Sequence, residues 1–426
     1  MTATDETEKP EKGNSSDHPF GKILRESLEA NTVTVTVLAL VTATVLGGIL
    51  CAFTNPLVLH APGAGATIAR AWDVASATYV ALFENSVVNP HTVTALFGQA
   101  SLGTAIHDGF LGSLFGPLSE TATFATPLIL AGLAVALPYR AGMFNIGAQS
   151  QFIGGAIVAA WLGYAVSLPI VVHVVVCVLG GFAGGAAIGA LTGTVKARTG
   201  AHEVIVTIML NYVMQYFLAW LLSSKSLMQA PGSPNPITPP IASSAHLPPL
   251  AGSNLRINAG FLIALACAFG VWWLLNRTTT GLEFRSVGAN PNASRVAGMD
   301  VGRTWILAML IAGGLAGLAG SAIINGTDFT LNPQSYGTWG IDAITVALLG
   351  RGSPGGVVAA GLLFGALDAG SGAMQAATST PVQIVQVLQA LVVLFVAAPP
   401  LIRTMFRLRA TRGGGIGAAM SKGWNA

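Results

Sequence analysis

Uncharged amide side chains are the most distinctive polar groups inside the apolar stretches of this sequence. Asn145, Gln149 and Gln151 lie together at the start of one stretch, and Asn211 and Gln215 lie four residues apart in another. A helix carries residues at that spacing on one face. Amides donate and accept hydrogen bonds without adding charge, which suits hydroxyl groups and nucleobase edges. These residues are predicted to line a solute path, with helix capping and cross-linking as the alternative.

Asp342 is the strongest single candidate for a functional residue, with Thr345 beside it. Both lie in an otherwise apolar run, residues 339–347. A carboxyl group in such a run needs a partner or water, because ionisable groups within a bilayer are costly and usually face a cavity or another helix. The alternative is an interhelical hydrogen bond with no ligand involved. A further polar set, predicted to be a packing face, comprises Gln383, Gln386 and Gln389.

The sequence carries no motif for catalysis, nucleotide binding or metal binding. It has no Walker phosphate-binding loop, no nucleophile elbow and no His-Glu-x-x-His pattern. We therefore expect no enzyme activity, and no ATP, cofactor or metal bound by this chain itself. His173 is predicted to be a buried, hydrogen-bonded histidine, and Cys51, Cys177 and Cys267 are predicted to be inert core residues.

Composition identifies the elements that must position these side chains. Of the 426 residues, 52% are hydrophobic and only 9% are charged, whereas soluble domains carry about 25% charged residues. The apolar residues fall in blocks of about 20, the length of a helix that crosses a bilayer core. The prediction is an all-α polytopic membrane protein with about ten transmembrane helices, which excludes a water-soluble enzyme. The predicted spans are residues 32–54, 122–138, 144–164, 168–192, 204–222, 259–276, 304–324, 336–349, 355–369 and 381–402.

The distribution of basic residues predicts the orientation of the chain in the membrane. With the N-terminus inside, seventeen of the twenty Lys and Arg residues fall on the inner side. Cytoplasmic segments carry such an excess, so both termini are predicted to be cytoplasmic. Residues 1–31 are predicted to be a disordered or amphipathic tail rather than a cleaved signal peptide, 32–402 the transmembrane domain, and 403–426 a basic tail. The three basic residues left outside are Arg70, Lys225 and Arg256.

Interruptions and long loops mark further places of interest. The spans at 336–349 and 355–369 are short, and short interrupted helices often line a pathway. The outer segments 55–121 and 223–258 are predicted to be surfaces for an external partner. For the first segment, the alternative is an interfacial helix at residues 68–83 that lies on the outer leaflet.

Two sequence repeats predict how the helices associate. Val135-Ala136-Leu137 followed by Arg140 recurs as Val346-Ala347-Leu348 followed by Arg351, which predicts two parallel halves related by a pseudo-two-fold axis along the membrane normal. Glycines also recur every four residues, which predicts close helix packing. They are Gly181, Gly185, Gly189 and Gly193 in one span and Gly313 and Gly317 in another.

The inner segment 277–303 is long, basic and rich in small residues. Its Asn290-Pro291-Asn292 turn is predicted to start a short helix at residues 293–297, which Gly298 ends. Such a helix on the inner surface is suited to docking in a groove of a partner protein. The alternative is a solvated loop without a special role.

The text GANPNASRVAGMDV in this segment resembles the coupling loop of permease subunits in bacterial ABC importers for simple sugars, nucleosides and branched-chain amino acids. Three further motifs resemble the nucleoside-type branch: PLILAGLAVALPYRAGMFNIGAQSQ, TGAHEVIVTIMLNYV and GIDAITVALLG. The resemblance covers residues 126 to about 400. The family usually has Glu and Gly where this chain has Gln149 and Ser150.

The resemblance implies a plasma-membrane importer with two permease subunits, which are identical or homologous. It also implies two ABC ATPase subunits, which bind ATP and Mg²⁺, and an extracytoplasmic substrate-binding lipoprotein. Asn145, Gln149, Asn211 and Asp342 would flank the translocation path, and residues 293–299 would meet the ATPase. The predicted coupling residues are Asn290, Ala293, Arg295, Ala297, Gly298 and Met299.

The predicted function is therefore a permease subunit of an ABC importer that translocates nucleosides. Ribose, other simple sugars or branched-chain amino acids are alternative solutes for the same machinery, and no nucleic-acid partner is expected. An ion-coupled secondary transporter is the alternative of another class, but it would need several carboxylates or histidines as a relay. Asp342 and Asp368 are nearly alone in that respect. A channel would not need the helix-forming inner loop.

Overall fold

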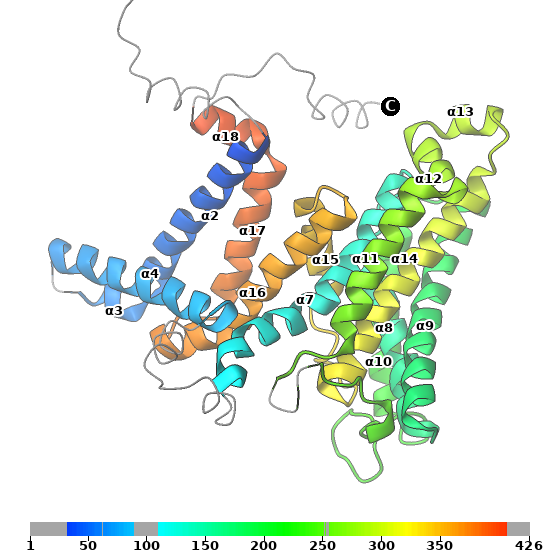
Figure 1. Ribbon diagram of the computed structural model, residues 1–426, viewed down its shortest axis with the longest axis horizontal. Coiled ribbons are helices and arrows are strands. Elements are labelled where there is room, and N and C mark those ends of the chain that lie inside the picture. Colours follow the sequence, from blue (N-terminus) through cyan, green and yellow to red (C-terminus); the bar gives the residue numbers. More distant parts are fainter. Residues whose placement is uncertain (1–31, 62, 89–109, 251, 253–254, 407–426) are drawn as a thin grey trace, which may run out of the picture. The chain divides into compact units, whose positions relative to one another are not determined.

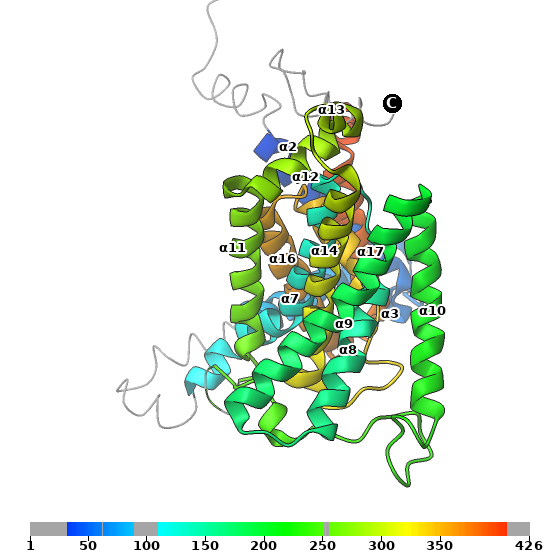
Figure 2. The same ribbon diagram turned by 90° about the vertical axis from the view of Figure 1, so that its right-hand side faces the viewer.

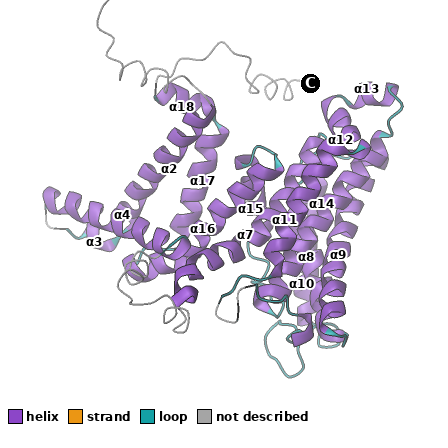
Figure 3. Ribbon diagram, viewed as in Figure 1, coloured by secondary structure: helices purple, strands orange, loops and turns teal. Residues whose placement is uncertain are grey.

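The computed structural model describes residues 32–61, 63–88, 110–250, 252 and 255–406 as helices and loops (Figure 3). By its internal contacts the chain divides into two units, one of residues 47–393 and one of residues 1–46 with 394–426. In the smaller unit the described residues belong to the start of α2 (Thr32–Thr54), the end of α17 (Gln383–Ala397) and α18 (Pro399–Met405). The predicted N-terminal tail and most of the C-terminal tail lie outside the described residues. The larger unit holds the elements discussed below.

Every predicted span falls on a helix, which confirms an all-α, polytopic membrane protein. Seven helices are long and apolar enough to cross a membrane, namely α2, α7, α9, α10, α11, α14 and α16, and α15 and α17 are shorter apolar helices. The remaining predicted span corresponds to α8. The bounds in the larger unit are α3 (Pro56–Leu59), α4 (Ala64–Ser86), α7 (Phe110–Arg140), α8 (Ala148–Ala165), α9 (Ile170–Thr199), α10 (Glu203–Ser223), α11 (Ala259–Arg277), α12 (Thr279–Ala289), α13 (Pro291–Val296), α14 (Val301–Ile323), α15 (Trp339–Leu349) and α16 (Pro354–Thr378).

The core of the larger unit surrounds α7, whose apolar span is 94% buried, whereas that of α10 is only 17% buried. Helices α14, α15, α16 and α11 pack against α7, and α9 packs along α14 and α8. In Figure 2, α10 and α11 lie on opposite sides of this bundle. The exposed, apolar faces of these outer helices are the surfaces that a lipid bilayer covers.

Glycine contacts hold α9 against α14. A Cβ atom at Gly185 would collide with the backbone of Gly313 and Gly317, and one at Gly189 would collide with the carbonyl oxygen of Met309. Only a helix face without side chains allows backbones to approach this closely. The prediction of a glycine packing face is therefore confirmed.

Two helices begin inside the bundle rather than at its end. After α7 the chain turns back, and the Asn145 side chain reaches the carbonyl oxygen of Ala134, 3.1 Å away and about 9 Å short of the inner end of α7. Helix α8 therefore begins at Ala148 and not at residue 144. Helix α15 has 11 residues, about 16 Å, which is roughly half of a bilayer core.

The two interrupted helices meet at their N-termini. Gly340 in the first turn of α15 lies against Gln149 in the first turn of α8, and a Cβ atom on Gly340 would collide with the Gln149 backbone. The irregular segment before α8, residues 141–147, is mostly buried, whereas the segment before α15, residues 329–338, is exposed at Gln334, Gly337 and Thr338. Non-helical backbone at membrane depth is tolerated only where protein buries it or where it lines a cavity.

The repeated text ends two helices that pack against each other. Helices α7 and α15 are neighbours, and the Arg140 Nε atom donates a hydrogen bond of 3.1 Å to the carbonyl oxygen of Gly352. The ends of both copies therefore meet at one end of the bundle, as a parallel repeat requires. The pseudo-two-fold axis itself stays a prediction.

The inner segment 277–303 contains more helix than was predicted from the sequence. Segment 277–303 forms α12 and α13, which lie at the end of the bundle opposite the segment between α10 and α11 (Figure 1). Gly142 of the turn after α7 packs on Gly288 of α12, with 3.1 Å between its ideal Cβ position and the Gly288 Cα atom. The expected short helix at 293–297 is observed at Pro291–Val296.

The first outer segment is also partly helical. The interfacial helix expected at residues 68–83 lies within α4, which packs on α16, where Thr78 lies against Thr378 and Leu82 against Gly370. Its opposite side exposes Ile68, Trp72 and Phe83. Whether lipid or an external partner covers this side stays a prediction.

Candidate functional site

Asn145 and Gln151 form a reciprocal amide pair in the turn before α8. The Asn145 Nδ2 atom donates to Gln151 Oε1 at 2.8 Å, and Gln151 Nε2 donates to Asn145 Oδ1 at 3.1 Å. Asn145 also donates to the Ala134 carbonyl oxygen and accepts from the Gly147 N–H at 3.1 Å. Both side chains are fully buried. The Asn145 amide therefore uses all of its hydrogen-bonding capacity within the chain.

Gln149 and Asn211 satisfy the backbone groups at the two interrupted helix ends. Gln149 Oε1 accepts the Gly340 N–H at 2.7 Å, and its Nε2 donates to the carbonyl oxygens of Tyr336 and Gly337 at 3.1 Å. Asn211 Oδ1 accepts the Ser150 N–H at 2.9 Å, and its Nδ2 donates to the Ile146 carbonyl oxygen at 3.0 Å. The first N–H groups of a helix lack partners within it, so these amides act as caps inside the bundle.

The structure thus brings four predicted path residues, Asn145, Gln149, Gln151 and Asn211, to the start of α8, where each bonds to backbone or to another amide, and we call this group the amide network. Gln215 is half-buried on α10, and its side chain makes no hydrogen bond within the described part of the chain. Whether any of these residues meets the solute stays a prediction.

Asp342 lies two residues beyond the amide network contact at Gly340. It is half-buried, and its Oδ2 atom accepts a hydrogen bond from Thr338 Oγ1 at 2.6 Å. Thr345 Oγ1 donates to the Asp342 carbonyl oxygen at 2.6 Å. The partner that the carboxyl group needs is therefore local, and the carboxylate retains capacity to accept further hydrogen bonds.

Other polar side chains in the bundle are structural. His173 is buried and lies 2.8 Å from Ser244 Oγ and 3.1 Å from the Leu162 carbonyl oxygen, which confirms a hydrogen-bonded histidine. Of the predicted packing face, only Gln389 is buried, and it donates to Asp368 at 2.9 Å. Gln383 and Gln386 are exposed, so the prediction of a packing face is wrong for these two residues. Among the described residues no group of His, Cys, Asp and Glu could hold a metal ion.

A cavity of about 260 Å³ lies where α15 begins. Phe124 of α7 and Trp339 of α15 form an aromatic wall, with ring centroids 6.2 Å apart and planes inclined by 31°. Asp328, Gln334 and Arg256 bring polar side chains from the segments before α15 and α11. Thr123, Ile323, Thr327 and Ser335 complete the lining. We call this the outer cavity.

Several polar groups of the outer cavity keep hydrogen-bonding capacity. Within the described segments, the Gln334 amide and the Trp339 indole N–H have no hydrogen-bond partner, and Asp328 accepts only a 3.3 Å bond from Thr327. Arg256 is different, because its Nη1 atom forms an ion pair with Glu120 Oε2 at 3.0 Å. The cavity therefore offers a carboxylate, an amide and an indole N–H beside an aromatic surface.

Sequence reasoning missed these cavity residues as site residues. The available signal was the short, interrupted span at 336–349, which was predicted to line a pathway, but the predicted path residues lie inside the apolar runs and not in the loop before α15. In the sequence, Phe124 and Trp339 look like ordinary apolar residues of membrane spans. Asp328 and Gln334 look like polar residues of a connecting loop. Their convergence depends on how the loop folds back against α7, which residue spacing does not show.

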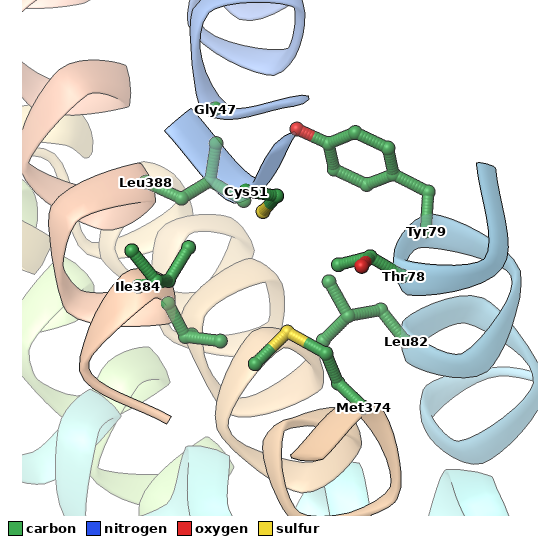
Figure 4. A pocket seen from close by; sticks show the side chains of 9 residues that line it. Gly47, Cys51, Thr78, Tyr79, Leu82, Met374, Ile384 and Leu388 are labelled. Carbon is green, nitrogen blue, oxygen red and sulfur yellow. The ribbon is translucent and has the colours of Figure 1, made fainter. Parts of the chain in front are cut away.

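A second hollow is too small to hold a solute. Figure 4 shows its lining, in which Tyr79 and Thr78 of α4 and Met374 of α16 face Cys51 of α2. Its volume is about 10 Å³, which is no more than one water molecule needs. It is a packing defect between apolar side chains and not a binding site.

The predicted coupling helix is exposed and well capped. In α13, Asn290 Oδ1 accepts the N–H groups of Asn292 and Ala293 at 3.0 Å, and Gly298 ends the helix with a φ of 85°. Ser294 is its only buried residue. Val296 is 91% exposed, although it was not among the predicted coupling residues. An apolar side chain at the tip of an exposed helix is a feature of contact surfaces.

Comparisons with known proteins agree with this architecture. Residues 118–397 match the family described as the permease component of the branched-chain amino acid transport system. The chain is 35% identical over 308 residues to the guanosine ABC transporter permease protein of Bacillus subtilis, which covers 72% of this chain and 88% of that protein. It is also 35% identical over 299 residues to the glucose ABC transporter permease protein of Haloferax volcanii, covering 67% and 77%.

A third relative is the nucleoside ABC transporter permease protein of Lactococcus lactis subsp. cremoris, 33% identical over 299 residues, 68% of this chain and 81% of that protein. No solved structure matches the chain. The matched family, the apolar helices and the extent of these similarities show that the chain belongs to the family of ABC transporter permease components and is a multi-pass plasma-membrane transport subunit.

Proposed function

We propose that this protein is the membrane-spanning permease subunit of an ATP-driven importer for nucleosides. The observation that carries the proposal is the similarity, over about two thirds of the chain or more, to relatives named as guanosine and nucleoside permeases. The outer cavity supports it, because an aromatic wall beside uncharged and acidic hydrogen-bonding groups suits a planar base joined to a hydroxylated sugar.

The free energy for transport comes from a partner ATPase that binds ATP and Mg²⁺. Helix α13 is the proposed contact, with Val296 inserted into a groove of the ATPase and Ala293, Arg295 and Ala297 around it. These four side chains are all exposed on the helix. A second permease subunit and an extracytoplasmic substrate-binding protein complete the importer.

Substitutions in α13 test the coupling contact. Ala297→Arg or Val296→Asp is expected to abolish uptake and co-purification of the ATPase, because each places a charge in an apolar contact. Glu283→Gln on α12, a half-buried residue outside the predicted coupling set, is the control and should leave both unchanged. Normal ATPase co-purification with Val296→Asp and Ala297→Arg would refute the contact.

Uptake measurements test the solute. Labelled nucleosides, ribose, glucose and leucine are offered to a strain that lacks this chain and to the same strain complemented with it. Loss confined to nucleosides supports the proposal. Loss confined to glucose would favour the second candidate, a sugar permease, which the similarity to the Haloferax volcanii protein favours.

An ion-coupled transporter is the less favoured mechanism. Asp342 is bonded to Thr338 and Asp368 to Gln389, and the two carboxylates lie near enough to interact. A proton relay across the bundle would need further carboxylates or histidines beside them, and the described segments hold no cluster of three such groups. Uptake that persists when ATP is depleted and the ion gradients are kept would contradict the ATP-driven proposal.

A further inference from the structure

We propose that the outer cavity is a solute-binding site of the permease, in which Trp339 stacks on the base of a nucleoside while Asp328 and Gln334 bind its hydroxyl groups or base edge. This inference rests on the proposed function and adds to it a location and a set of contacts. It assigns solute selectivity to the permease as well as to the external binding protein.

The location of the cavity is the first argument. It forms around residues 323–339, where α14 ends in a π-helical turn (Ile324–Asp328) and the chain runs without regular structure to the start of α15. Helices interrupted inside a membrane protein commonly mark solute sites, because irregular backbone there must be buried or line a cavity. Arg256 and Asp328 are both exposed at its edge, on the predicted outer side.

The chemistry of the walls is the second argument. The rings of Trp339 and Phe124 already pack against each other, with 6.2 Å between their centroids. A planar ligand would therefore stack on this wall and not between the two rings. Stacking on aromatic side chains is the usual mode for nucleobases and is tolerant of base identity. The free amide of Gln334 and carboxylate of Asp328 can donate to and accept from ribose hydroxyls.

The charges of the cavity disfavour an amino acid. A zwitterionic amino acid needs a cation for its carboxylate, and the only cationic side chain among the described lining residues, Arg256, is already paired with Glu120. A hexose could use the hydrogen-bonding groups and pack a C–H face on the wall, but it presents no planar π surface that would stack on it. A nucleoside uses both the aromatic wall and the polar groups.

The amide network holds this site in place. The Gln149 side chain donates to the carbonyl oxygens of Tyr336 and Gly337 and accepts the Gly340 N–H, which fixes the backbone on both sides of Trp339. Gln149 is therefore a positioning residue for the aromatic wall.

Uptake by the complete importer in cells tests the site. Trp339→Ala, Asp328→Asn and Gln334→Ala are compared in the complemented strain, with co-purification of the ATPase as the measure of assembly. We expect Trp339→Ala to lower nucleoside uptake about tenfold, since it removes a stacking contact. Trp339→Phe, which keeps an aromatic face, should restore most of it. The matched control outside the cavity is Trp220→Ala on α10, an exposed tryptophan that should behave as wild type when replaced.

Each outcome decides the proposal. Reduced nucleoside uptake by the three cavity variants with normal assembly supports it. Wild-type uptake by Trp339→Ala and Asp328→Asn overturns the site while leaving the proposed function intact. If Trp339→Ala fails to assemble, Asp328→Asn and Gln334→Ala decide alone. A wild-type importer that takes up only glucose or leucine overturns the proposed nucleoside function and, with it, the nucleoside assignment of the cavity.

Discussion

The amide network and the outer cavity are both polar regions within an apolar bundle, but they use their polar groups differently. Asn145 and Gln149 are buried, and their amides are bonded to backbone groups and, for Asn145, to the Gln151 amide. Gln334 and Trp339 keep donor and acceptor groups that no described residue satisfies. In the amide network, the polar groups form hydrogen bonds that hold irregular backbone inside the membrane. In the outer cavity, hydrogen-bonding groups remain available to a solute.

This difference shows why polar residues in a transmembrane sequence do not by themselves identify a pathway. An interrupted helix exposes N–H and carbonyl groups that lipid cannot satisfy, so some amides are required only to permit the interruption. The solute site then forms beside the interruption, from residues that are less conspicuous in the sequence.

The largest effect is expected from Asn145→Leu. This change leaves the Gln151 amide, the Ala134 carbonyl and the Gly147 N–H without their partner, and each unsatisfied buried group costs about 1–3 kcal/mol. We expect the purified complex to lose most of its thermal stability or to fail to accumulate. A thermal midpoint equal to that of the wild type would show that the network does not hold the fold.

A smaller effect on stability is expected from Gln149→Leu, which uncaps α15 and releases the Tyr336–Gly337 backbone. The midpoint should fall less than with Asn145→Leu, while uptake should fall strongly because Trp339 moves. Gln149→Glu retains an acceptor for the Gly340 N–H and should therefore retain more uptake. The comparison fails if Gln149→Leu changes stability but not uptake.

Asp342→Asn should lower or alter uptake by a few-fold with normal assembly. The amide oxygen of Asn can still accept the hydrogen bond from Thr338, so the local fold is kept while the charge is lost. Unchanged uptake of every imported solute would refute a role for the Asp342 carboxylate in transport.

The smallest effect is expected from Gln215→Ala. Its side chain is half-buried and makes no hydrogen bond among the described residues, so the change in the free energy of unfolding should stay within about 0.5 kcal/mol. Uptake tells whether Gln215 lines the solute path or has only a structural role. A reduction of tenfold or more would place it in the path despite its lack of partners among the described residues.

The fold was more predictable from the sequence than the site. Apolar blocks located every helix that spans the bundle, and the glycine spacing in α9 and α14 anticipated their contact, because these patterns reflect burial and backbone approach directly. Helix ends were less predictable. The sequence at 141–147 is apolar enough to continue a span, and only tertiary hydrogen bonds such as that of Asn145 with Ala134 stop it. At 329–338, by contrast, Asn332, Pro333 and Gln334 already mark an interruption in the sequence.

The candidate site was predictable only in part. The amides were found, since polar residues in apolar text are conspicuous, but their bonds to one another could not be read from spacing. Gln149 and Gly340 are 191 residues apart and are joined by the packing of two interrupted helices. Phe124 and Trp339 carry no signal beyond their apolar character, so only the structure shows that they share a wall with Asp328.

The most direct test of this account compares Asn145→Leu with Trp339→Ala, measuring both the thermal midpoint of the purified complex and the uptake of labelled nucleoside. The account predicts that Asn145→Leu loses both and that Trp339→Ala loses uptake alone. It would be contradicted if Trp339→Ala imported nucleosides at the wild-type rate, or if Asn145→Leu kept its stability and lost only uptake, which would place the amide network in the solute path.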